Sequence, residues 1–134
     1  MKIYGIRDGL LTPSETELVY FARKFLSKIG ENCALQIVYD RTLFPEYRDI
    51  AYTDGETIFM SDKIFDLSRE NMIALLAHEI AHIYFMQRGI EHSEDEADEM
   101  AELLFGSKIY YDEFDIQTID PRNTKPFRPD YLPQ

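Results

Sequence analysis

One segment constrains this chain more than any other: the apolar run LLAHEIAHIYF, residues 75–85, which holds two of the three histidines in 134 residues. His78 and His82 are four residues apart, so on a helix they lie about 40° apart around the axis and project from one face. A run this apolar belongs in the interior, where a polar ring is costly without a partner. The spacing therefore predicts a buried helix whose two histidines serve one partner.

The letters HEIAH form the pattern HExxH, with Glu79 directly after the first histidine. Histidines at this spacing let two ring nitrogens reach one zinc ion at about 2.0–2.1 Å. Glu79 lies about 100° around the helix from His78, beside the metal. There it can take a proton from zinc-bound water, whose pKa the metal lowers toward about 7. Core histidines bonded to carbonyls are the weaker interpretation, because both lie on a predicted helix that an acidic segment follows closely.

A catalytic zinc site usually has three protein ligands and one open position, so a third ligand is needed. The metzincin pattern requires glycine at position 85 and histidine at position 88, but the sequence has Phe85 and Arg88. The remaining candidates are His92, which is the only other histidine, and the acids of the helix predicted to follow it, which are Glu94, Asp95, Glu96, Asp98 and Glu99.

In that helix EDEAD, residues 94–98, matches the pattern ExxAD, with Glu94 and Asp98 four residues apart on one face. Glu94 can bind zinc while Asp98 accepts a hydrogen bond from the free N–H of a motif histidine, which fixes its ring and tautomer. Asp95, Glu96 and Glu99 are explained by a solvated helix start, where acids suit the helix dipole. We therefore expect one zinc ion per chain.

HExxH followed by ExxAD, with IFMSDKIFDLSRENMIALLAHEIAHI containing the first motif, resembles the gluzincin zinc peptidases over roughly residues 56–106. The resemblance is closest to the minigluzincins, the small soluble relatives of the CAAX-type and HtpX-type membrane proteases. It implies a zincin-like domain that hydrolyses peptide bonds. By resemblance, zinc is bound by His78, His82 and Glu94, Glu79 is the general base and acid, and Asp98 orients a histidine.

In that group a strand before the HExxH helix forms the upper edge of the cleft and pairs with the substrate as an extra strand. Here ETIFMS, residues 56–61, is expected to be that edge strand. The family also has a tyrosine or histidine that stabilises the oxyanion, and no motif identifies it. His92, Tyr110 and Tyr111 are candidates only because they are close in sequence.

Two other functions remain open from the sequence. ImmA-type peptidases, which cleave specific repressors, have HExxH and a similar ExEAN helix, which EDEADEMAELL resembles with Asp98 in place of asparagine. Alternatively, the same residues bind a structural zinc ion that stabilises a small, non-catalytic domain, and this domain binds a partner.

The rest of the chain predicts an α+β fold in a single domain, residues 1–134. Helices are expected from Thr12 to Gly30, from about Ser68 to Arg88, and from Ser93 to about Gly106, because each follows a capping serine or threonine. Strands are expected at residues 33–40, on both sides of Asp54-Gly55, and at residues 108–114. Residues from about 107 onward look extended, and we expect them to pack over the cleft and keep the enzyme latent.

The net charge and the cysteine count indicate which partners and which cellular compartment to expect. A net charge of −11 argues against nucleic acid and anionic membranes as partners, since both are bound by clustered lysine and arginine. The single cysteine, Cys33, fits a reducing compartment, and no window approaches the roughly 18 apolar residues of a membrane span. We therefore expect a cytoplasmic protein acting on peptides or unfolded proteins.

Overall fold

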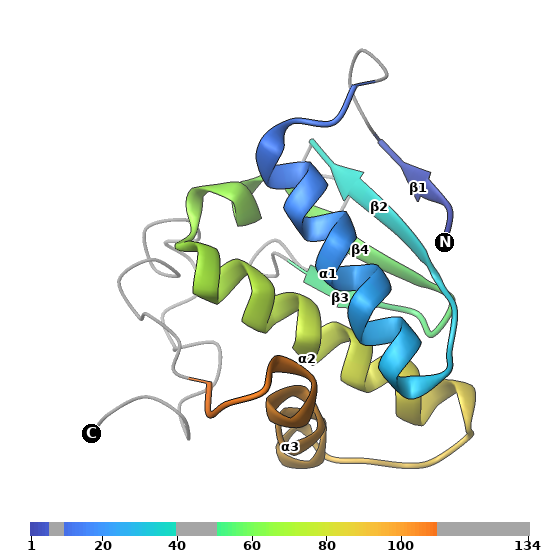
Figure 1. The fold of residues 1–134 in the computed structure, drawn as a ribbon. Coiled ribbons are helices and arrows are strands. Elements are labelled where there is room, and N and C mark those ends of the chain that lie inside the picture. Colours follow the sequence, from blue (N-terminus) through green and yellow to red (C-terminus); the bar gives the residue numbers. More distant parts are fainter. Residues whose placement is uncertain (6–9, 40–50, 110–134) are drawn as a thin grey trace.

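A computed structural model describes residues 1–5, 10–39 and 51–109, which form an α+β fold with a small sheet and three α-helices (Figure 1). The elements in chain order are β1 (Ile3–Tyr4), α1 (Pro13–Ile29), β2 (Ala34–Val38), β3 (Ala51–Thr53), β4 (Thr57–Ser61), the 3₁₀ helix η3 (Asp62–Asp66), α2 (Arg69–Gln87) and α3 (Glu94–Phe105). The expected fold class is confirmed.

The predicted helix starts are confirmed by their caps. The Thr12 hydroxyl accepts a hydrogen bond from the Glu15 backbone N–H at 3.1 Å, and Glu15 accepts one from the Thr12 N–H at 2.8 Å. Ser93 and Glu96 form the same reciprocal pair at the start of α3. Helix α1 ends at Gly30, whose φ of 68° is the left-handed conformation that glycine adopts without strain.

The sheet has the strand order β1-β2-β4-β3. Strands β1, β2 and β4 are parallel, and β3 pairs antiparallel with β4 in the predicted hairpin around Asp54 and Gly55. The expectation that residues 56–61 form an edge strand is wrong, because β4 has β2 on one side and β3 on the other. The backbone groups of β4 therefore form hydrogen bonds within the sheet, and among the described strands β3 is the outermost on this side.

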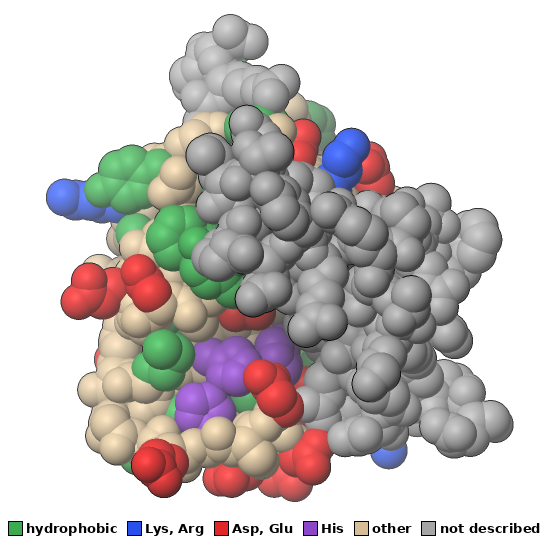
Figure 2. Space-filling view, turned by 180° about the vertical axis from the view of Figure 1, so that it is seen from behind, with side chains coloured by type: hydrophobic (Ala, Val, Ile, Leu, Met, Phe, Trp, Pro, Cys, Tyr) green, Lys and Arg blue, Asp and Glu red, His purple; other side chains and the backbone are tan. Residues whose placement is uncertain are grey.

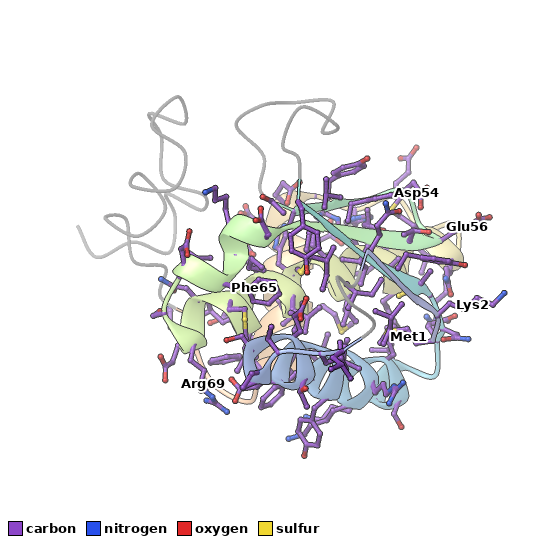
Figure 3. All side chains as sticks on the ribbon, turned by 90° about the horizontal axis from the view of Figure 1, so that it is seen from above. Met1, Lys2, Asp54, Glu56, Phe65 and Arg69 are labelled. Atoms are coloured by element: carbon purple, nitrogen blue, oxygen red, sulfur yellow. The ribbon has the colours of Figure 1, made fainter. Side chains whose placement is uncertain are left out.

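Helix α2 lies at the centre of the packing and contacts α1, α3 and β3. Figure 1 shows α1 across the sheet and α3 against α2. Every residue of α2 from Asn71 to Ala81 is buried, which explains why most residues of this stretch are apolar on all sides of the helix. In Figure 3, Arg69 at the start of α2 and Asp54 in the β3–β4 turn lie at opposite ends of the molecule. At the other end of α2, Gln87 donates to the Gly55 carbonyl at 3.0 Å, so α2 spans the length of the sheet.

Several expectations fall outside the described residues. Tyr110, Tyr111 and almost all of the segment from 107 onward, including most of the expected strand at 108–114, are among them. In the part of the chain that the structure describes, every helix is too short or too polar to cross a membrane.

Candidate metal centre

The two motif histidines lie on α2 with their rings in contact. Their ring centroids are 4.6 Å apart with the planes at 87°, and their Nε2 atoms are 3.0 Å apart. His78 is buried, with 2% of its surface exposed, whereas His82 is half-buried. The buried helix has therefore brought two ring nitrogens to one point, as the spacing predicts.

Glu94, the first residue of α3, brings a carboxylate oxygen to the same point. Its Oε2 lies 2.9 Å from His78 Nε2 and 3.2 Å from His82 Nε2. The three residues form a group whose potential ligand atoms all lie within 4.8 Å of one another. The Ser93 cap fixes where α3 begins and so places Glu94 beside α2.

The geometry of this group, which we call the three-donor group (His78 Nε2, His82 Nε2 and Glu94 Oε2), fits a zinc ion. Tetrahedral zinc with bonds of about 2.0–2.1 Å holds its ligand atoms about 3.3 Å apart. The edges of the triangle here are 2.9, 3.0 and 3.2 Å, so a widening of a few tenths of an ångström satisfies that geometry. Two imidazole nitrogens and one carboxylate oxygen are also a donor set that zinc accepts.

Asp98 lies where the sequence predicts a partner for a motif histidine. Its Oδ1 is 2.7 Å from His78 Nδ1, and only 2% of the residue is exposed. Because a carboxylate accepts, Nδ1 of His78 carries the hydrogen and Nε2 is the nitrogen that faces the three-donor group. Asp98 is one turn after Glu94, so a single helix supplies both the carboxylate donor and the carboxylate that orients its neighbour.

His92 occupies a position that the sequence does not predict. Its Nε2 lies 2.6 Å from Nδ1 of His82, on the far side of that ring from the three-donor group. His92 therefore lies outside the three-donor group. His92 follows His82 by ten residues, so the sequence indicates that the two residues are close. Only the fold shows that His92 contacts Nδ1 of the His82 ring.

The carboxylates at this centre favour positive charge, either a proton on His78 or a metal ion. Hydrogen bonds with His78 and His82 hold the pKa of the Glu94 carboxyl well below its usual range, so it is ionised at neutral pH. Burial lowers the pKa of His78, but hydrogen bonds with Asp98 and Glu94 outweigh it and raise this pKa to about 9. A metal ion that bound this group would have to displace that proton, so its affinity would depend on pH.

Glu79 is buried directly beside the first histidine, with 4% of its surface exposed. Its negative charge contributes to the raised pKa of His78, which places the carboxylate within electrostatic reach of that ring. Glu79 is not a member of the three-donor group. It is thus an acidic group near the centre that is not one of the three potential donors.

The centre lies at the surface rather than deep inside. Figure 2 shows the histidine side chains gathered on one face, beside acidic side chains. Next to them is an open hollow of about 460 Å³ between the end of α2 and the start of α3, lined by Met86, Gly89, Ile90, Glu91 and His92. Glu94 itself is exposed, so a molecule in solution can reach the three-donor group.

Comparisons of the chain with protein-family models, with curated proteins and with solved structures found no match.

Proposed function

We propose that this protein is a zinc-dependent metallopeptidase that hydrolyses peptide bonds in peptides or unfolded proteins. One observation carries the proposal: both HExxH histidines and Glu94 direct a donor atom to one point, with triangle edges of 2.9–3.2 Å. An N₂O donor set of three protein ligands leaves a fourth position for water or substrate, which is the arrangement of catalytic rather than structural zinc. The exposure of Glu94 supports access to that position.

In this proposal a bound zinc ion would act as a Lewis acid that polarises the scissile carbonyl and lowers the pKa of water toward neutral pH. His78, His82 and Glu94 hold the ion, and Asp98 keeps the Nδ1 hydrogen of His78 in place. The Glu79 carboxylate takes a proton from the attacking water and delivers it to the leaving amine nitrogen. Its burial next to His78 supports this role, because a carboxylate there is held close to the reaction without occupying a metal position.

An extended substrate needs backbone groups to pair with, and β3 is the outermost described strand on the side of the sheet away from β1. We propose β3, in place of residues 56–61, as the strand beside which substrate lies. The contact between α2 and β3 supports this choice, since α2 carries the histidines.

The decisive experiment compares the wild-type chain with Glu79→Gln for zinc content and for cleavage of a mixed peptide library. We expect about one zinc per chain in both proteins. Cleavage should fall by about 10²–10⁴-fold in the variant, which is the contribution typical of a general base. Glu99→Ala, which changes an exposed acid of α3, is the control and should cleave like the wild type.

Other outcomes separate the alternatives. Zinc in both proteins with equal, negligible cleavage of the library would favour a non-catalytic zinc site or an enzyme restricted to one protein, as ImmA-type peptidases are. To test latency, a chain that ends before Thr124 is assayed beside the full chain; we propose that the truncation raises cleavage, and unchanged cleavage by a folded, zinc-loaded truncation would contradict this. A cytoplasmic location is part of the proposal, supported by the free, buried Cys33.

A further inference from the structure

His92 connects one metal-facing histidine to the backbone. Its Nε2 is 2.6 Å from His82 Nδ1, and its own Nδ1 is 3.2 Å from the Ile90 carbonyl oxygen. A carbonyl oxygen only accepts, so Nδ1 of His92 carries the hydrogen. In neutral His92 the Nε2 atom is then an acceptor, and the donor in the short contact is Nδ1–H of His82.

This direction of hydrogen bonding decides the tautomer of His82. With the hydrogen on Nδ1, the lone pair of the ring is on Nε2, the atom that belongs to the three-donor group. The hydrogen bonds thus run from His82 through His92 to the Ile90 carbonyl. Asp98 does the same for His78, so each histidine has an acceptor on its far nitrogen.

The position of the His92 ring is itself fixed by the end of α2. The ring stacks on Phe85 with centroids 4.6 Å apart and the planes at 18°, and the Ile90 N–H donates to the Phe85 carbonyl at 2.9 Å. The backbone that leads to His92 is therefore tied to the same helix that carries His82.

We propose that His92 is a positioning residue that holds His82 in the Nδ1–H tautomer with Nε2 directed at zinc. This inference rests on the proposed zinc site and gives His92 a role other than a ligand or an oxyanion group. Because His92 is half-buried and forms a wall of the open hollow, water can partly replace it when it is removed. The expected loss of zinc affinity is therefore about tenfold, at the lower end of what such orienting partners contribute.

Three substitutions separate hydrogen bonding from packing. His92→Ala removes both the acceptor and the ring. His92→Phe keeps a ring that can stack on Phe85 but has no acceptor. His92→Gln places an amide oxygen near the position of Nε2, so it restores the acceptor without the ring. Zinc affinity is measured on the full chain by competition with a chromophoric chelator, and ¹⁵N NMR of the His82 ring reports which nitrogen is protonated.

We expect His92→Ala and His92→Phe to lose about tenfold in zinc affinity and to show a mixture of His82 tautomers, while His92→Gln stays close to the wild type. If all three variants bind zinc like the wild type, His92 has no positioning role. A much larger loss that His92→Gln fails to restore would make His92 a ligand and also overturn the proposal. A wild-type chain that binds no zinc would remove the proposed function as well, and the affinity of the wild type is measured first for that reason.

Discussion

The two histidines of the motif have the same chemistry but different surroundings. His78 is buried and its far nitrogen meets the carboxylate of Asp98, which is buried too. His82 is half-buried and its far nitrogen meets the imidazole of His92 at the wall of an open hollow. One motif histidine thus has a carboxyl partner in the interior, and the other has an imidazole partner near solvent.

The difference follows from where each partner comes from. Asp98 belongs to α3, the helix that also supplies Glu94, and α3 packs against α2. His92 belongs to the connection between these helices. A partner inside a packed helix is held by many contacts, whereas a partner on a connection depends on a few, here Phe85 and Ile90. We call His78 with Asp98 the His78 half of the centre, and His82 with His92 the His82 half. We expect substitutions in the His78 half to lower zinc affinity and stability more than substitutions in the His82 half.

The largest effect should come from removing the donor that both halves share. In Glu94→Ala the centre loses one of three protein ligands, so zinc affinity should fall by more than the roughly 100-fold that an orienting partner contributes. Elemental analysis of the purified protein should find zinc largely lost. Glu99→Ala, on the same helix, should keep about one zinc per chain. Zinc retained in Glu94→Ala would show that the third ligand is a different residue.

The pH dependence of the metal-free protein should isolate the His78 half. The folded-state pKa of His78 is raised from 6.5 to about 9, so its contribution to stability is fully present below pH 6.5 and is lost as the pH rises through 9. The rise corresponds to at most about 3 kcal/mol. Denaturant unfolding in the presence of a chelator should therefore give a lower free energy of unfolding at pH 9.5 than at pH 6.5.

The same measurement on Asp98→Asn is the control, because the amide keeps an acceptor for His78 Nδ1–H but removes the charge that favours the protonated ring. Its loss of stability between pH 6.5 and 9.5 should be smaller than that of the wild type. An equal loss in both proteins would mean that another group causes it.

Removing the buried acceptor should weaken zinc binding by an intermediate amount. Asp98→Ala leaves the His78 Nδ1–H without its carboxylate, so we expect zinc affinity to fall about 10–100-fold, more than in His92→Ala. Chelator competition under one set of conditions compares the two variants directly. Equal losses in both would contradict the idea that the buried half dominates.

The smallest effect should come from the helix cap that positions α3. Ser93→Ala removes the hydroxyl that accepts from the Glu96 N–H, which should cost about 1 kcal/mol in the free energy of unfolding and weaken zinc binding slightly. Ser68→Ala removes the corresponding cap of α2, whose hydroxyl accepts from the Asn71 N–H at 3.3 Å. It should cost similar stability without affecting zinc, because Ser68 caps the opposite end of α2, roughly 15 Å along the helix from His78. Denaturant unfolding measures the loss of stability in each variant, and zinc titration shows whether only Ser93→Ala also loses zinc affinity.

Local features of this protein were predictable because they depend on neighbours in sequence. The capping pairs Thr12–Glu15 and Ser93–Glu96 form where the letters predict them, and the hairpin turns at Asp54-Gly55. The four-residue spacing of His78 and His82 fixed their common face, since helix geometry repeats every 3.6 residues. The four-residue spacing of Glu94 and Asp98 likewise predicted that one could serve the centre while the other oriented a ring.

Other features were decided only when distant segments packed together. The sequence of residues 56–61 predicts a strand, but it does not show which strands pair with it. Its position between β2 and β3 depends on how those distant segments pack. His92 was one of several polar residues near the motif until packing set its Nε2 against His82. Spacing along a helix determines which side chains share a face, whereas the approach of a second segment determines which atoms meet. The sequence determined that the two histidines share one face of a helix. The tertiary structure determined which residue bonds to the Nδ1 atom of each, Asp98 for His78 and His92 for His82.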